Sequence, residues 1–210
     1  AAAVIAGTVP DGWYEPLPRD PDSWRKRLQS VRSEFGDDWL EKLSPAIDAS
    51  GKAMERLQAA AKGRGVVVTT GQQPGLFGGP VYTLSKALSA LTLADSLQEV
   101  TGIPVAPVFW AATDDTDFRE ASSTVVSVPG GAQLLRIEHS EPLGNTMATM
   151  PLGDLSPQLE ALKRAAGSAV DPTPIELLER FYRSSATVGS AYVSFLRAVL
   201  ATLGIAVIGS

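Results

Sequence analysis

The sequence predicts a protein of the α/β class that is built on a parallel sheet. Residues 66–70 (VVVTT) are β-branched without polar alternation, which is typical of a strand buried on both faces. Residues 71–80 (GQQPGLFGGP) contain four glycines and two prolines and predict a loop. A helical pattern follows, and residues 103–112 (IPVAPVFWAA) form a second continuous apolar strand. Strand, helix and strand in this order predict a βαβ unit with parallel strands and a right-handed crossover.

The residues before this unit predict an N-terminal arm and a helix. Residues 8–21 are rich in proline and aromatic residues, and we expect an extended arm that lies on the domain. Asp22 or Ser23 is the predicted cap of the helix, and Gly36 ends it. Its predicted apolar stripe consists of Trp24, Leu28, Val31 and Phe35.

A second, longer helix is predicted from residue 37 towards residue 62, and Pro45 is expected to kink or split it. These helices form an N-terminal segment that leads into the sheet. We therefore expect residues 1–65 to pack, as arm and helices, on a core formed by residues 66–210, in one domain overall.

The helix after the loop is predicted from Val81 to about Val100, with Pro80 at its first position and Gly102 at its end. Apolar residues occupy most of its surface, so we expect this helix to be largely buried. They are Val81, Leu84, Ala87, Leu88, Ala90, Leu91, Leu93, Ala94 and Leu97.

The rest of the chain predicts shorter elements, which form a connecting segment inserted into the sheet fold and the return to the sheet. The last strand is expected to be buried. Strands are predicted at Ser123–Val128, 134–137 and 205–208, and helices at Ser156–Ala166, 174–182 and 187–203.

The composition excludes several classes of function. The net charge of −5, with no cluster of Lys or Arg, makes nucleic acid an improbable partner. The chain has no cysteine and one histidine, His139, so it lacks the residues for thiolate chemistry and for Cys- or His-rich metal sites, and we predict no metal. No apolar run approaches the about 20 residues that span a bilayer, and we expect a cytoplasmic protein without a membrane partner.

The loop at residues 71–80 is the first candidate site, because ligands of parallel sheets bind at the carboxyl ends of strands. Glycines allow a ligand to approach the backbone closely, and the following helix presents the positive end of its dipole to an anion. The alternative is a tight turn whose glycines only permit close packing, and the sequence of a Walker P-loop is absent. The candidates are Gly71, Gln72, Gln73, Gly75, Gly78 and Gly79, with Lys86 within reach of an anionic group.

Asp114, Asp115 and Asp117 directly follow the second strand and form the second candidate site. Three carboxylates within four residues repel one another, and a cation, an amine or a ribose hydroxyl would relieve that repulsion. One carboxylate would then act as an acid or a base. The alternative is that Thr113 or Asp114 caps a short helix with Asp117 in its first turn, and the two interpretations do not exclude each other.

The remaining aromatic and histidine residues favour structural roles. Phe109 and Trp110 lie in a predicted buried strand and are expected in the core. Trp13 and Tyr14 are expected to anchor the arm. His139 is expected to be a surface or structural residue.

Two segments, TTGQQPGLFGGPVYTLSKALSALTLA and PVFWAATDDTDFREA, resemble the bacillithiol biosynthesis cysteine-adding enzyme family. The resemblance depends on the pattern T-G-Q-Q-x-G-L-F-x-G-P-x-Y-T-x-x-K at residues 70–86, followed by P-V-F-W and an acidic D-x-D-F. It is clearest over residues 66–121 and is weaker in the N-terminal helices and in the last segment. The chain resembles the N-terminal part of such a protein.

The resemblance implies a Rossmann-like core with inserted connecting segments, related in architecture to class I aminoacyl-tRNA synthetases. The implied reaction joins the carboxyl group of cysteine to the amino group of glucosaminyl-malate as an amide. Asp115 and Asp117 are the implied catalytic candidates, since either carboxylate would orient the amine and accept its proton. The residues implied to bind substrate are Gly71, Gln72, Gln73, Gly75, Gly78, Gly79, Tyr82, Lys86 and Asp114.

The chain departs from the family in two ways. The family has a Glu-Asp-His-Asp pattern where this chain has Asp114, Asp115, Thr116 and Asp117, so a role that needs an imidazole is missing. The family's chains are longer, with a C-terminal coiled-coil region implicated in nucleotide binding and dimer contacts, so ATP or ADP and a homodimer are expected only in the longer form. Three hypotheses stay open: a ligase-like enzyme, a non-catalytic module that binds a nucleotide or a sugar acid, and an inactive N-terminal fragment.

Overall fold

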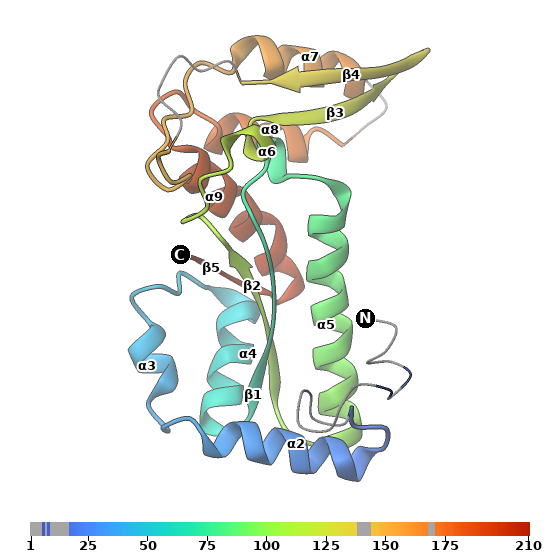
Figure 1. The fold of residues 1–210 in the computed structure, drawn as a ribbon, viewed down its shortest axis with the longest axis vertical. Helices are drawn as coiled ribbons and strands as arrows, with labels where there is room; N and C mark the ends of the chain where they lie inside the picture. The colour runs from blue at the N-terminus through green and yellow to red at the C-terminus, as the bar shows by residue number, and fades with distance from the viewer. Residues whose placement is uncertain (1–5, 7, 9–16, 138–143, 168–170) are drawn as a thin grey trace.

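A computed structural model describes residues 6, 8, 17–137, 144–167 and 171–210, which form an α/β fold around a parallel sheet (Figure 1). The strand order is β1-β2-β5, where the strands are β1 (Val66–Gln72), β2 (Val105–Ala111) and β5 (Ala206–Gly209). Both neighbouring pairs are parallel, so the predicted βαβ unit is confirmed. Residues 9–16 of the predicted arm, with Trp13 and Tyr14, and also His139 lie outside the described residues.

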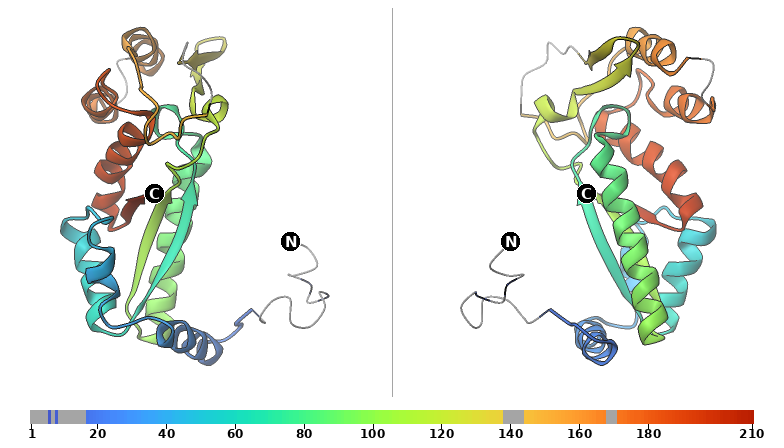
Figure 2. Two further views of the ribbon diagram at one scale, coloured as in Figure 1. Left: turned by 60° about the vertical axis from the view of Figure 1, so that its left-hand side comes forward. Right: turned by 90° about the vertical axis from the view of Figure 1, so that its right-hand side faces the viewer.

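Helices cover both faces of the sheet (Figure 2). On one face, α5 (Val81–Thr101) and α9 (Val188–Leu200) pack with Phe109 of β2 in one buried cluster. On the opposite face, α4 (Gly51–Lys62) packs against Val108 of the same strand. Consecutive residues of a strand point to opposite faces, which is why the continuous apolar pattern of β2 serves two helical layers.

The expectation that α5 is largely buried is wrong. Alanines such as Ala87 and Ala94 face the sheet and are fully buried, while Val81, Leu84 and Leu88 are exposed. Small side chains let the helix lie close to a sheet of only three strands, and among the described residues no further layer covers its outer side. Although α5 is long, no described helix is long and apolar enough to cross a membrane.

The first described helix, α2 (Pro21–Ser33), crosses one end of the sheet. Its cap is Asp20, whose carboxylate accepts a hydrogen bond from the Ser23 N–H at 2.8 Å, so the predicted cap at Asp22 or Ser23 is wrong. The helix ends before Phe35, which is 57% exposed and does not belong to the apolar stripe. Prolines are favoured at the first helical position, which places the cap one residue before Pro21.

The second predicted helix is split into α3 (Trp39–Leu43) and α4. Between them, Ile47 forms an isolated antiparallel bridge with Ile208 of β5 and is buried against the sheet. Pro45 precedes this bridge, so the predicted break falls where the chain turns to reach the sheet. The division into residues 1–65 and 66–210 stays a prediction.

The predicted connecting segment forms a lobe at the carboxyl end of the sheet, shown at the top of Figure 1. It has its own buried cluster, which includes Met147, Leu152 and Tyr182 and also takes in Leu76 from the loop after β1. Its elements are α6 (Phe118–Ala121), the antiparallel hairpin of β3 (Ser123–Val128) and β4 (Gly131–Arg136), α7 (Ser156–Ala166) and α8 (Thr173–Phe181). Two short 3-10 helices complete the fold, η1 (Leu76–Gly78) and η2 (Ala201–Leu203).

Candidate functional site at the carboxyl edge of the sheet

The carboxyl ends of the three parallel strands meet at one edge. The N–H of Ala112, just after β2, donates to the carbonyl oxygen of Gln72 at the end of β1 over 3.1 Å. The N–H of Ser210, just after β5, donates to the carbonyl oxygen of Ala111 over 3.2 Å. These bonds extend the sheet by one residue and bring the candidate residues of three separate segments to the place where parallel sheets bind ligands.

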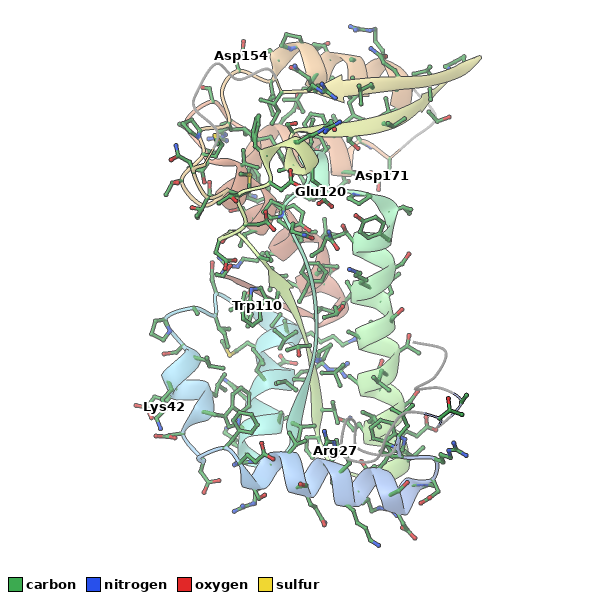
Figure 3. The ribbon with its side chains drawn as sticks, viewed as in Figure 1. Arg27, Lys42, Trp110, Glu120, Asp154 and Asp171 are labelled. Atoms are coloured by element: carbon green, nitrogen blue, oxygen red, sulfur yellow. The ribbon has the colours of Figure 1, made fainter. Side chains whose placement is uncertain are left out.

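A cavity of about 360 Å³ opens at the end of β1, and we call it the glutamine pocket. Trp110 forms part of its wall and is 52% exposed, which contradicts the prediction that it lies in the core. It projects from β2 on the side of α4 (Figure 3), whereas Phe109 points to the other face and is buried as expected. The pocket is lined by Thr69, Thr70, Gly71, Gln72, Gln73, Lys86, Trp110 and Ala112.

Three polar side chains in this pocket form a directed chain of hydrogen bonds. Lys86 Nζ donates to Oε1 of Gln72 at 2.8 Å and to the carbonyl oxygen of Gly71 at 3.3 Å. The Nε2 of Gln72, which is 8% exposed, donates to Oε1 of Gln73 at 2.6 Å. An ammonium group only donates, so it holds the oxygen of the Gln72 amide towards itself and leaves the Gln73 NH₂ group as the donor at the end of the chain.

Tyr82 links this series of hydrogen bonds to the connecting lobe. Lys86 Nζ lies 5.4 Å from the centre of the Tyr82 ring, and the Tyr82 hydroxyl donates to Oε1 of Glu120 over 3.4 Å. Partial removal from water raises the pKa of Tyr82, and the negative charge of Glu120 raises it further. Tyr82 is therefore a neutral hydrogen-bond donor at physiological pH, and Glu120 on α6 (Figure 3) lies at the rim of the candidate site.

The loop glycines are explained by close packing, the alternative that the sequence left open. A Cβ on Gly71 would lie 2.6 Å from the carbonyl oxygen of Trp110, and one on Gly75 would lie 2.6 Å from Cα of Gly79. A Cβ on Gly78 would lie 2.7 Å from the Phe195 ring. Neighbouring atoms fill the space that a side chain would need at these positions, so close packing by itself accounts for the glycines there.

The loop is also anchored by the lobe. Tyr182, at the end of α8, accepts a hydrogen bond from the Gly78 N–H at 2.9 Å and donates to the carbonyl oxygen of Gly75 at 3.4 Å. Burial raises the pKa of Tyr182, which keeps its hydroxyl protonated. Gly78 and Gly79 line a different, more apolar cavity of about 670 Å³ between α5, α8 and α9. Of the predicted loop residues, Gly71, Gln72 and Gln73 line the glutamine pocket, Gly78 and Gly79 line the second cavity, and Gly75 lines neither.

The three aspartates act as caps and turn residues. Asp117 Oδ1 accepts from the Glu120 N–H at 3.1 Å and begins α6, and Asp115 Oδ1 accepts from the Asp117 N–H at 2.6 Å. Asp114 Oδ1 accepts from the Ser210 hydroxyl at 2.6 Å. A short helix follows the aspartates as predicted, but Asp117 is its cap, so the prediction that Thr113 or Asp114 caps it with Asp117 in the first turn is wrong. The walls of the glutamine pocket include none of the three.

The polar groups at this edge are neutral amides, one lysine and exposed carboxylates. Within the described ranges, no group of three or more His, Asp or Glu side chains is arranged to hold a metal ion. Two residues at this edge, Trp110 and Glu120, were not predicted as site residues. The exposure of Trp110 depends on which helices cover the sheet, and the contact of Glu120 joins residues 38 positions apart, so neither leaves a local signal in the sequence.

The parallel sheet and the glycine loop between β1 and α5 define a Rossmann-like domain, and the pocket at its carboxyl edge is its candidate binding site. Over residues 11–210 the chain matches the family described as the N-terminal Rossmann-like domain of the bacillithiol biosynthesis protein BshC. The chain belongs to this family, and the resemblance inferred from the loop and the strand after it is confirmed.

Proteins named "putative cysteine ligase BshC" are similar to this chain. The one from Solibacter usitatus is 37% identical over 67% of this chain, and the one from Exiguobacterium sibiricum is 32% identical over 76%. A third, from Heliobacterium modesticaldum, is 46% identical over 40% of the chain. The matched regions span 26%, 31% and 15% of these relatives, so the chain corresponds to less than a third of their length.

Proposed function

We propose that this chain provides the Rossmann-like part of a cytoplasmic ligase that joins cysteine to glucosaminyl-malate in bacillithiol biosynthesis. The observation that carries the proposal is the hydrogen-bond chain from Lys86 through Gln72 to Gln73. It ends in an NH₂ donor polarised by a positive charge, in a pocket at the carboxyl edge of the sheet. Such a donor suits a carboxylate acceptor, and glucosaminyl-malate carries two carboxylates on its malate part.

In this proposal the aspartates act on the amine of glucosaminyl-malate. Amide formation joins the amine nitrogen to the carboxyl carbon of cysteine and breaks one carbon–oxygen bond of that carboxylate. The oxygen leaves as water together with two protons given up by the ammonium nitrogen, one of which passes through a base. Asp115 or Asp117 would orient the amine and accept that proton, since each uses one carboxylate oxygen as a cap and keeps the other for a ligand. Thr116 stands where the family has histidine and does not transfer protons near neutral pH.

No step is assigned to a nucleotide. Atoms of Gly79, Phe195 and Trp110 lie where side chains at the loop glycines would stand, so packing accounts for these glycines without a bound nucleotide phosphate. Glucosaminyl-malate and cysteine are the proposed partners. In this proposal, only the longer form of the protein binds the nucleotide and forms a homodimer.

The second candidate is a module that binds a sugar acid without chemistry. Two observations favour it: Thr116 replaces the family's histidine, and all three aspartates are occupied as caps or turn acceptors. Both candidates use the glutamine pocket, so binding alone does not separate them.

Isothermal titration of the purified chain with malate, glucosaminyl-malate, cysteine and ATP tests the proposal. We expect saturable binding of glucosaminyl-malate, which Gln73→Ala weakens by about 10-fold through loss of the terminal donor. Gln133→Ala on the exposed strand β4 is the matched control and should bind like the wild type. A folded chain that binds none of the four compounds contradicts the proposal for this chain. Binding that survives Gln73→Ala places the site elsewhere.

A further inference from the structure

The second cavity lies between α5, α8 and α9 and shares no wall residue with the glutamine pocket. Its volume of about 670 Å³ lies within the range of small-molecule sites, which are mostly apolar with a few well-placed polar groups. Its apolar walls include Phe77 of η1, Leu84 of α5, Leu177 of α8, and Phe195 and Val199 of α9. Because these residues come from four separate elements, the cavity is formed by the folding of this chain itself.

Thr83, in the first turn of α5, is a polar residue in this mostly apolar wall. It is 2% exposed, and within the described ranges its Oγ1 has no hydrogen-bond partner. Threonines in helices commonly bond the carbonyl oxygen three or four residues earlier, and Thr83 does not. A buried hydroxyl without a partner costs free energy and needs an explanation. A ligand in the cavity would supply the missing partner.

Tyr192 of α9 provides a second hydroxyl of this kind. It is fully buried, and its Oη likewise has no partner among the described residues. Burial raises the pKa of Tyr192 and the nearby Thr83 hydroxyl lowers it, so the two hydroxyls are neighbours although they are not hydrogen-bonded to each other. A Cβ on Gly79 would lie 3.0 Å from Thr83 Oγ1 and 3.7 Å from Cε2 of Tyr192, so the glycine keeps a side chain out of the space beside them. Both hydroxyls are therefore free to donate to the same acceptor.

The charges at the cavity favour an anionic head group over a cationic one. Helix α5 begins at the cavity with Val81, and its first turn carries neither an acidic residue nor a side-chain cap, so the positive end of the helix dipole is not neutralised. Of the described wall residues only Asp171 (Figure 3) is charged, and it is exposed. Its carboxylate accepts from the Thr173 N–H at 3.0 Å and from the Thr173 hydroxyl at 2.7 Å. The negative charge therefore lies on the solvent side, while the buried polar groups are donors.

We propose that the second cavity binds a carboxylic acid with an apolar tail. The tail packs against Phe77, Leu177 and Phe195. The carboxylate accepts hydrogen bonds from the hydroxyls of Thr83 and Tyr192 near the start of α5. A helical threonine has two accessible χ1 rotamers, so the Thr83 hydroxyl can turn towards the carboxylate. This second site does not depend on the proposed reaction.

Titration calorimetry of the purified chain with octanoate tests the site. Octyltrimethylammonium, which has the same tail length and a cationic head, is the matched control ligand. We expect saturable octanoate binding, with the cation bound at least about 10-fold more weakly, because its head accepts no hydrogen bond and is repelled by the positive helix end. Absence of octanoate binding to a chain that unfolds cooperatively overturns the proposal. Equal or tighter binding of the cation also overturns it, because the tail or Asp171 would then select the ligand.

Two substitutions remove the hydroxyls with little change of shape. Thr83→Val and Tyr192→Phe should each weaken octanoate binding by about 10-fold and leave the weak binding of the cation unchanged. Thr124→Val on β3, outside the walls of the cavity, is the matched control and should bind like the wild type. Octanoate binding that survives both substitutions overturns the assignment of the carboxylate to these hydroxyls.

Unfolding in urea without ligand separates a binding role from a structural one. Since neither hydroxyl has a partner in the described part of the chain, Thr83→Val and Tyr192→Phe should unfold at the same urea concentration as the wild type or at a higher one. Octanoate should then raise the midpoint of the wild type more than that of either variant. Midpoints well below that of the wild type would mean that a buried water or a group of this chain satisfies the hydroxyls, and that result overturns the proposal.

Discussion

Lys86 Nζ lies 2.8 Å from Oε1 of Gln72 and fixes the orientation of the Gln72 amide. The two residues are 14 positions apart, on α5 and at the end of β1, and the loop between them brings them together. Because the amide is held in one orientation, its NH₂ group meets the oxygen of Gln73. Lys86 thus determines which group of Gln73 faces the pocket, without itself having to contact a ligand.

Replacing Lys86 tests this relay. Lys86→Met removes the ammonium group and frees the Gln72 amide to turn, so we expect the affinity for glucosaminyl-malate to fall about 10-fold. Lys86→Arg keeps a donor and should recover part of the loss. Titration calorimetry measures both, and Lys52→Met on the exposed surface of α4 is the control.

A double-mutant cycle separates a positioning role from direct contact. If Lys86 acts through Gln73, the losses in Lys86→Met and Gln73→Ala should not add in the double variant. Fully additive losses would show that Lys86 contacts the ligand independently.

Gly71 is expected to be intolerant of any side chain. Its Cβ would lie 2.6 Å from the Trp110 carbonyl oxygen, which belongs to the neighbouring strand and has no freedom to move. Gly71→Ala should therefore lower the free energy of unfolding by about 1–3 kcal/mol through overpacking. Gly131→Ala is the matched control, because a Cβ there meets no atom within 4 Å. Urea unfolding of both variants gives the comparison, and equal midpoints would contradict the packing account of the loop.

The βαβ unit could be predicted from the sequence because each of its sequence signals is local. The run at residues 66–70, the glycine loop and the apolar run before Asp114 each lie within one element or one turn, and all three structures follow. The caps Asp20 and Asp117 lie two to four residues from the predicted positions. Local hydrogen bonding, which operates over three residues, determines such features.

Which side chains are buried by helices distant in the sequence could not be predicted in the same way. Phe109 and Trp110 are equally apolar neighbours, yet one is buried and the other is 52% exposed, because α4 covers only part of its face. Leu84 and Leu88 match a buried helix by pattern and are exposed for a similar reason. The site residue Glu120 depends on the lobe folding back over α5, a contact across 38 residues that no local pattern reports.

Asparagine variants distinguish capping from catalysis at the aspartates. Asn keeps the acceptor oxygen that begins α6, so Asp117→Asn should change the free energy of unfolding by less than about 0.5 kcal/mol. It does not accept a proton, so if Asp117 is the base the rate of amide formation should fall by about 10²–10⁴-fold. Asp115→Asn is tested in the same way, with unfolding and activity measured on the same preparation. Activity that survives both changes would exclude the carboxylate mechanism.

Acid should weaken the protein through three exposed aspartates that lie at or just before helix starts. The Ser23 N–H and hydroxyl hold the pKa of Asp20 below its ordinary value, the Ser156 hydroxyl and N–H do the same for Asp154, and the Thr173 N–H and hydroxyl for Asp171. A carboxyl whose pKa is lower in the folded state contributes stability above its unfolded pKa, about 3.9, and loses it as pH falls through the folded pKa. The contribution is therefore complete at pH 7 and declines below about pH 4.

The triple variant Asp20→Asn, Asp154→Asn, Asp171→Asn isolates this contribution. Asparagine keeps the acceptor oxygens without a charge, so at pH 7 the variant should unfold at a slightly lower urea concentration than the wild type. As the pH falls from 5 towards 2, the wild type should lose its advantage, because protonation removes the same charges that the substitutions removed. Urea midpoints at several pH values measure the difference directly. A gap that stays constant over this range would mean that the three carboxylates do not couple folding to proton binding.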